Sequence, residues 1–261
     1  MTRADFSGLW DQLLSEGMNT ITIDEIESRT GVTRNAVYLG VKYAIDRKRL
    51  FSPARGLYVV VPPEYRRVGV VPAVQFIDPM MSHLGIDYYL GLATAASWWG
   101  SSHHASQEFQ VIVNSRLPNR TIGNVRFRFI SRAKLDAKSI RRVAGPRTML
   151  NVSTPDLTAV DLAANPEHVG GYSNVATILA ELPDLDGSRI AALSKRRKRS
   201  DARRLGWLLS LVQPDLTLCA LKKVAEPDQG QPTLLTPKGP RKGRLDSDWN
   251  VLVNTTVEPD L

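Results

Sequence analysis

The side chains best suited to a specific chemistry in this sequence are hydrogen-bond donors and acceptors between positions 33 and 55. An arginine and an asparagine are adjacent at positions 34 and 35. Arginine matches the major-groove edge of guanine, and asparagine matches that of adenine. The sequence leaves open whether each of the two contacts a base or a phosphate. The candidate residues for binding a nucleic acid are Thr33, Arg34, Asn35, Tyr38, Lys42 and Arg55.

A helix capped by Thr33 and continuing to about Lys48 would carry most of these residues. Its apolar stripe is Ala36, Val37, Gly40, Val41, Ala44 and Ile45, spaced as one face of a helix. The candidate residues lie off that stripe, on the first turns of the opposite face. Small residues in the stripe favour close packing against the preceding helix.

Two shorter helices are predicted before this one. Apolar residues from Phe6 to Leu14 recur at helical spacing, and Gly17 supplies a left-handed C-terminal cap. Thr22 and Glu25 have the spacing of a capping box, which begins a second helix that ends near Thr30. A tight turn at Gly31 then leads into the third helix, so the layout is that of a helix-turn-helix.

A β-hairpin is predicted directly after the third helix. Leu50 and Phe51 form one strand, 52–56 the turn and 57–61 the second strand. Arg55 would lie at the tip of this wing, where it can meet a phosphate or the minor groove. The hairpin completes the pattern of a winged helix-turn-helix that binds double-stranded DNA.

The distribution of charge agrees with this interpretation. The chain of 261 residues has a formal net charge of +8 and a pI near 9.7, which favours anionic partners. Residues 1–28 contain one basic and six acidic residues, whereas residues 29–67 contain nine basic and two acidic residues. The positive charge of the module is therefore on the third helix and wing.

The rest of the chain predicts a mixed α/β region, so the fold class is α+β, with a winged helix over 1–66 and a larger domain over 67–261. A helix is expected from Asp87 to Trp99, and strands at 108–113, 125–130 and 249–254. Further helices are expected at three places: 155–162, with Thr154 as cap, 172–181 and 187–193.

Two further basic segments form a second candidate surface for an anionic partner. Between 116 and 147 there are ten Lys or Arg residues and one acid, and the alternation at 125–130 places two arginines on the open face of a strand. DNA, RNA or an acidic protein would fit, and a solvated surface explains the charges equally well. The residues singled out are Arg126, Arg128, Lys195, Arg196, Arg197, Lys198 and Arg199.

The sequence predicts no enzyme, no cofactor and no metal. The four histidines lack the spacing of a helical metal pair, and His103 and His104 are adjacent in a predicted loop. Gly100-Ser101-Ser102 has no nearby carboxylate pair of the kind that a nucleotidyltransferase needs, although dispersed carboxylates could still converge in space. A single cysteine, no apolar signal segment and no long apolar run favour a cytoplasmic protein with no membrane segment.

Four segments resemble the AbiEi family of antitoxins in order and spacing over about 250 residues. The resemblance implies an N-terminal winged helix, a larger C-terminal domain, repression of the protein's own toxin–antitoxin operon and neutralisation of a nucleotidyltransferase-like toxin. Asp156 and Leu157 depart from the family, which tends to have Glu and Arg there. The segments are Arg55-Gly56-Leu57-Tyr58-Val59, 154–162, Arg204-Leu205-Gly206-Trp207-Leu208-Leu209 and Trp249-Asn250-Val251-Leu252-Val253-Asn254.

The expected function is therefore that of a DNA-binding antitoxin and autorepressor, whose partners are double-stranded operator DNA and a cognate toxin. The alternative is a ligand-responsive winged-helix transcription regulator, which would need a concave and mostly apolar pocket.

Overall fold

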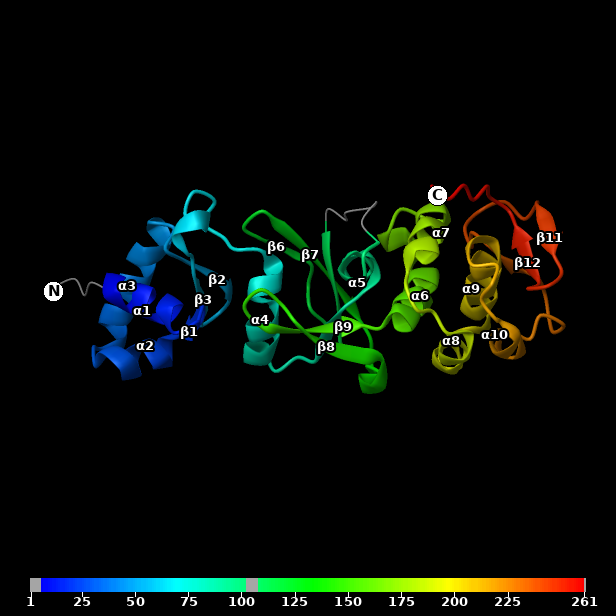
Figure 1. Cartoon of the computed structure of the whole chain (residues 1–261). Coiled ribbons are helices and arrows are strands. Elements are labelled where there is room, and N and C mark those ends of the chain that lie inside the picture. The colour runs from blue at the N-terminus through cyan, green and yellow to red at the C-terminus, as the bar shows by residue number, and fades with distance from the viewer. Residues whose placement is uncertain (1–5, 102–107, 261) are drawn as a thin grey trace. The chain divides into compact units, whose positions relative to one another are not determined.

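The computed structural model describes residues 6–101 and 108–260, and its helices and three sheets make an α+β fold, as predicted (Figure 1). His103 and His104, predicted to lie in a loop, are outside the described residues. Packing divides the chain into two units. The first is Met1–Tyr89, Gln107–Leu135 and Arg142–Asn151, and the second is Leu90–Ser106, Asp136–Arg141 and Val152–Leu261. The predicted boundary after residue 66 stays a prediction.

The N-terminal part of the first unit consists of three helices and a small antiparallel sheet of order β1-β3-β2 (Figure 1). Its core is apolar and includes the fully buried side chains of Leu13, Ile26 and Val37. The elements are α1 (Ser7–Ser15), β1 (Thr20–Thr22), α2 (Ile23–Thr30), α3 (Arg34–Asp46), β2 (Leu50–Ala54) and β3 (Leu57–Val60).

Short-range signals set the ends of these helices. The Thr22 hydroxyl accepts from the Glu25 backbone N–H at 3.3 Å, and the Glu25 carboxylate accepts from the Thr22 N–H at 2.7 Å. This is the predicted capping box, which satisfies two otherwise unpaired donors at the start of α2. Gly31 ends α2 with φ +66°, and Gly17 follows α1 with φ +77°. Both glycines adopt the left-handed conformation that a residue with a Cβ rarely takes.

The hairpin differs from its prediction in one detail. The strand β2 continues through Pro53 to Ala54, so only Arg55 and Gly56 form the turn. A register shift between Phe51 and Ala54 accommodates the proline, and β2 is an edge strand, where a missing N–H is tolerated. Gly56 has φ +81°.

A six-stranded sheet of order β6-β7-β5-β4-β9-β8 follows the N-terminal elements in the sequence. β5 runs parallel to β7, with Phe109 opposite Phe127, and β6 runs antiparallel to β7. The predicted strands at 108–113 and 125–130 are confirmed. The elements from here to Ser153 are α4 (Ile77–Leu84), β4 (Tyr88–Leu90), α5 (Leu92–Trp98), β5 (Glu108–Val113), β6 (Arg120–Ile122), β7 (Val125–Ser131), β8 (Ile140–Ala144) and β9 (Met149–Ser153).

The predicted helix from Asp87 to Trp99 is wrong over its first turn. Residues 88–90 form the buried strand β4, Gly91 is extended with ψ 179°, and α5 begins only at Leu92. A strand buried on both faces is apolar at every position, so periodicity does not distinguish it from a buried helix. Helix α4 is an element that the sequence patterns did not predict.

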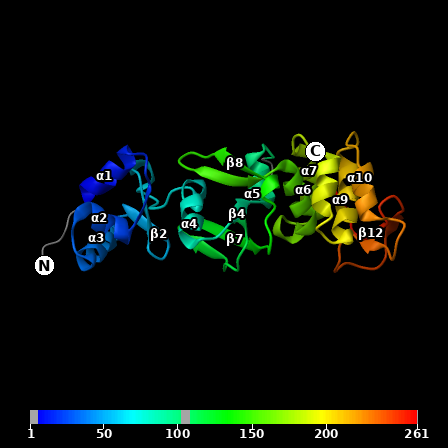
Figure 2. The same cartoon turned by 90° about the horizontal axis from the view of Figure 1, so that it is seen from below.

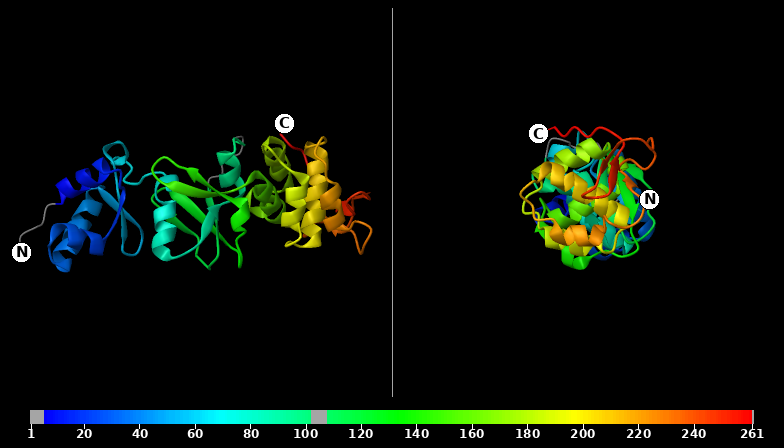
Figure 3. Two further views of the ribbon diagram at one scale, coloured as in Figure 1. Left: turned by 60° about the horizontal axis from the view of Figure 1, so that its bottom comes forward. Right: turned by 90° about the vertical axis from the view of Figure 1, so that its right-hand side faces the viewer.

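Helices dominate the second unit, in which α9 packs against α6, α7, α8 and α10 (Figures 2 and 3). Leu205, Leu208 and Leu209 of α9 are buried at its centre. The three helices predicted after residue 154 are confirmed, and Thr154 caps the first by accepting from the Leu157 N–H. The helices are α6 (Pro155–Ala164), α7 (Tyr172–Glu181), α8 (Gly187–Ser194), α9 (Arg199–Val212) and α10 (Cys219–Ala225).

A small sheet of order β10-β12-β11 closes the described chain. Its strands are β10 (Thr233–Leu234), β11 (Arg244–Asp246) and β12 (Val251–Val253), so the predicted strand at 249–254 is shorter than expected. Trp249 instead packs on Gly206 of α9, where a Cβ would lie 2.1 Å from the indole ring. The indole N–H also donates to the Ser210 hydroxyl at 2.8 Å. Two of the segments that carry the AbiEi resemblance thus meet in the core.

The third such segment, 154–162, is also tied to later helices. Asp156, whose side chain is buried, accepts from the Arg189 Nε at 2.5 Å and from the Asp186 backbone N–H at 2.8 Å. Asp161 pairs with Arg197 at 2.9 Å. At the position where the sequence departs from the family pattern, the aspartate therefore anchors the start of α8 to α6.

Candidate nucleic-acid interface

Helix α3 presents the predicted contact residues on one exposed face. Thr33 is its N-cap, with an extended backbone, and its hydroxyl makes no cap hydrogen bond in the described structure. Arg34, Asn35, Tyr38 and Lys42 are all exposed. The helix starts with polar residues pointing to solvent, which is the arrangement needed to reach base edges in a groove.

The opposite face of α3 is fixed by burial. Val37, Gly40, Val41 and Ala44 are buried, as the predicted stripe requires, whereas Ile45 at its end is exposed. A Cβ on Gly40 would lie only 2.1 Å from the ring of Phe6. The glycine therefore lets the aromatic ring approach the α3 backbone, and this contact sets which face of α3 is turned outward.

Arg34 is held by two carboxylates of α2. Its Nη1 donates to Asp24 at 2.6 Å and to Glu27 at 2.8 Å, and its guanidinium lies 5.9 Å from the centre of the Tyr38 ring. The hydrogen bond to Asp24 raises the pKa of Arg34 above its already high value, so the side chain stays charged. Since the Arg34 side chain is 53% exposed, the pairs are screened by water and limit its motion more than they stabilise the fold.

The hairpin turn carries Arg55 at an exposed position. The backbone carbonyl of Arg55 lies 2.9 Å from the Nε2 of His83 on α4, and the Phe51 ring packs edge-on against Phe76 at 5.2 Å. These contacts anchor the hairpin to the following elements of the same unit, while the Arg55 side chain remains accessible.

The predicted second surface is less uniform. Arg126 is exposed on β7, and Phe127 and Phe129 point into the core, as the alternation predicted. Arg128 is paired with Glu108 on the neighbouring strand β5, through its Nε and, at 2.8 Å, its Nη2. The Glu108 contact raises the pKa of Arg128. Arg128 thus serves a cross-strand ion pair.

The basic run at 195–199 covers the turn between α8 and α9 and the first residue of α9, and its charge is also partly neutralised. Arg197 pairs with the fully buried Asp161 at 2.9 Å, and Arg199 pairs with Glu226 at 2.5 Å. Lys195, Arg196 and Lys198 are exposed. The run therefore combines two cations bonded within the protein with three that face solvent.

Sequence reasoning missed three residues at the α3 face. Asp24 and Glu27 enter the sequence prediction only as acidic residues, although they position Arg34. Leu39 is absent from that prediction, although its side chain is 53% exposed. The signal for Leu39 is its place four residues after Asn35 and three before Lys42, which puts the three on one helix face.

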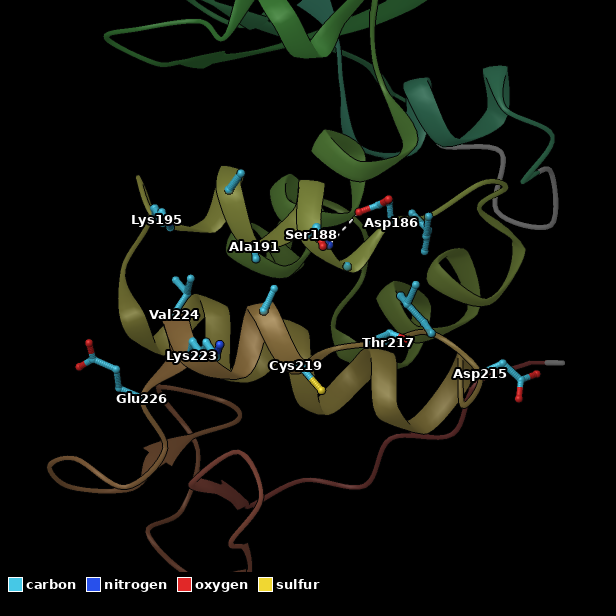
Figure 4. Close-up of a pocket in the computed structure, with 15 residues that line it drawn as sticks. Asp186, Ser188, Ala191, Lys195, Asp215, Thr217, Cys219, Lys223, Val224 and Glu226 are labelled. Carbon is cyan, nitrogen blue, oxygen red and sulfur yellow. Dashed lines mark hydrogen bonds between the residues drawn. The ribbon is translucent and has the colours of Figure 1, made fainter.

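A groove of about 1020 Å³ lies between α8 and α10 (Figure 4). Charged residues stand along it: Asp186, Lys195, Asp215, Lys223 and Glu226. Apolar side chains such as Ala191 and Val224 line the rest of it, so the groove mixes charged and apolar groups, whereas a site for a small-molecule effector is mostly apolar with a few polar groups. Within residues 6–101 and 108–260, no group of three or more His, Cys, Asp or Glu side chains could hold a metal, and no helix is long and apolar enough to span a membrane.

Comparisons with known proteins bear on the fold and on the family. The chain is similar to the crystal structure of the RV2827C protein from Mycobacterium tuberculosis, with a TM-score of 0.70 at 15% sequence identity, covering 96% of this chain and 92% of that chain. The likeness shows a shared fold. No curated protein matches the sequence.

Residues 89–211 match the model of the AbiEi antitoxin C-terminal domain. This range contains α6 to α8 and most of α9, together with the ion pairs Asp156–Arg189 and Asp161–Arg197 described above. The match confirms the predicted resemblance and the role of an antitoxin in a toxin–antitoxin system. Over residues 89–211 the chain thus resembles the AbiEi antitoxins.

Proposed function

We propose that this antitoxin binds double-stranded operator DNA through a winged helix formed by its N-terminal elements and represses its own operon. The observation that carries the proposal is the exposed face of α3, with Arg34, Asn35, Tyr38 and Lys42 in one helical surface. A cationic helix face with amide and guanidinium donors matches the major groove in charge and in hydrogen bonding.

The same proposal assigns neutralisation of a nucleotidyltransferase-like toxin to the C-terminal domain. Its support is the match of residues 89–211 to the antitoxin domain and the absence of α3 from that range. Repression and neutralisation would then be separable by mutation. Cytoplasmic location follows from binding to DNA and belongs to the same proposal.

The test uses the full chain carrying Arg34→Ala and Lys42→Ala together. We expect this variant to lose binding to the DNA preceding its own gene in a mobility-shift assay, and to lose repression of a reporter placed behind that DNA. It should still relieve the growth arrest caused by the toxin. Equal DNA binding by the double variant and the wild type at matched salt would contradict the proposal.

A matched control removes two cations elsewhere. Lys238 and Lys242 are exposed and lie near the closing sheet, so Lys238→Ala with Lys242→Ala changes the net charge by the same amount. We expect this control to bind and repress like the wild type. If it weakens binding as much as the α3 variant does, the effect is one of net charge and the α3 assignment is wrong.

A further inference from the structure

Leu39 is the most exposed of the large hydrophobic side chains that face solvent among the described residues, at 53%. It lies on α3 with Asn35 four positions before it and Lys42 three positions after it, a spacing that places the three side chains in one row along the helix. An apolar side chain thus stands between an amide and an ammonium group on the face proposed to enter DNA.

The neighbouring row of α3 consists of Arg34 and Tyr38, and its contacts differ from those of the row with Leu39. Tyr38 lies close to the Arg34 guanidinium, and Arg34 is bonded to Asp24 and Glu27 of α2. Arg34 of that row is thereby tied to α2, and Tyr38 is exposed. The row of Asn35, Leu39 and Lys42 lies beside it on the same helix, at exposed positions along the whole of the row.

The chemistry of the row matches one kind of surface. The thymine 5-methyl is the apolar group that bases present in the major groove, and asparagine pairs with adenine there. The helical rise puts Leu39 about 6 Å from Asn35 along the axis, which is close to two base-pair steps of about 3.4 Å. Lys42, at the end of the row, carries the charge that a nearby phosphate requires.

We infer that Leu39 contacts a thymine methyl group in the major groove and thereby selects a thymine within about two base pairs of the adenine contacted by Asn35. The inference rests on the proposed DNA-binding function and adds to it a specificity determinant. The positive charge of the exposed Lys42 beside the leucine favours DNA over a second copy of the chain as the occupant of this face.

The experiment begins with duplexes selected from a random pool by the wild-type protein. Each thymine of the selected site is then replaced singly by deoxyuracil, which removes only the methyl group. We expect one replacement to weaken wild-type binding about fourfold, the effect of taking one methyl-sized group out of an apolar contact. Leu39→Ala should bind more weakly and show the same affinity for the thymine and the uracil duplex.

Two variants serve as controls. Leu245→Ala shortens a leucine that is 51% exposed on β11, and it should keep the wild-type response to the uracil replacement. Leu39→Met retains an apolar side chain and should restore most of that response. Melting temperatures close to the wild-type value would show that all three variants fold.

The outcomes separate this inference from the function on which it rests. A methyl effect of equal size in the wild type and in Leu39→Ala, or none at any thymine, overturns the inference while DNA binding stands. A change in oligomeric state in Leu39→Ala, with uniform loss of affinity, would assign the face to contact between copies and also overturn it. Failure of the wild type to enrich any duplex contradicts the proposed function itself.

Discussion

Helix α3 and the segment from Lys195 to Arg204 both contain cations, but the contacts of these cations differ. In α3, Asn35 and Lys42 face solvent, and the pairs made by Arg34 are with carboxylates next to it at the surface. In the second segment, Arg197, Arg203 and Arg204 reach acceptors inside their own unit. The difference teaches that the number of cations in a segment does not by itself measure how many of them are available to an outside partner.

Arg203 shows the second use most fully. Its guanidinium donates to the backbone carbonyls of Ala225, Glu226, Gln229 and Gln231, and its side chain is buried. Burial lowers the pKa of Arg203, although an arginine stays charged. One side chain thus fixes the loop that follows α10 to helix α9.

We therefore expect Arg203→Ala to lower the stability of the protein more than the other substitutions. Truncation leaves several buried carbonyl groups without their donor, and we expect the free energy of unfolding to fall by about 4 kcal/mol. Urea denaturation followed by circular dichroism measures the change. A decrease of less than about 1 kcal/mol would mean that water replaces the guanidinium and that the loop does not depend on it.

The ion pair of Arg197 with Asp161 should give the next largest effect. Asp161 is fully buried, and Arg197→Ala should lower the free energy of unfolding by about 3 kcal/mol because a buried carboxylate then loses this cation. Its neighbour Arg196 is exposed, and Arg196→Ala should change stability by less than about 0.5 kcal/mol. Equal losses of stability in the two variants would contradict the conclusion that Arg197 is bonded within the protein and Arg196 is not needed for the fold.

Removing the carboxylates beside Arg34 should have a smaller effect on stability and should change the affinity for DNA. Because Asp24→Asn with Glu27→Gln removes two surface pairs, stability should change by less than about 1 kcal/mol. The freed guanidinium should increase affinity for non-specific duplex DNA and steepen its salt dependence by up to about 1 in the slope of log K against log salt. Weaker non-specific binding would show that the carboxylates hold Arg34 in its productive position.

The smallest expected effect is on how the stability of the protein depends on pH. Asp186 caps α8 by accepting from the backbone N–H groups of Arg189 and Ser188, and the Arg189 hydrogen bond lowers the pKa of Asp186. A carboxylate with a lowered folded-state pKa adds stability above its unfolded pKa and loses it as the pH falls through the folded value. The melting temperature of Asp186→Asn should therefore approach that of the wild type in acid and lie below it at neutral pH.

Features that depend on residues close together in the sequence could be predicted, and contacts between residues far apart in the sequence could not. The capping box of Thr22 and Glu25 and the buried stripe of α3 are local, so spacing alone predicted them. Asp161 and Arg197 are 36 positions apart, and no local pattern indicates that they pair. The buried strand β4 was predicted as helix because burial on both faces removes the alternation that identifies a strand.

The same holds for the candidate site, where the exposure of the side chains was predictable and their tertiary contacts were not. The exposure of Arg34, Asn35, Tyr38 and Lys42 followed from helical periodicity, whereas the hold of Asp24 and Glu27 on Arg34 depends on the angle between α2 and α3. Arg128 was predicted on an open strand face, and its pairing with Glu108 depends on the register of β5 with β7. Sequence patterns therefore located the surface, and tertiary packing decided which of its charges remain accessible.

The central claim is that α3, and not the basic run at 195–199, supplies the cations that neutralise DNA phosphates. The most direct test measures operator affinity across a range of salt concentrations for the wild type, for Arg34→Ala with Lys42→Ala, and for Arg196→Ala with Lys198→Ala. We predict that the slope of log K against log salt falls by about 1 for each phosphate that the α3 variant no longer neutralises, and stays unchanged in the other variant. A reduced slope in the Arg196 and Lys198 variant with an unchanged slope in the α3 variant would contradict the account.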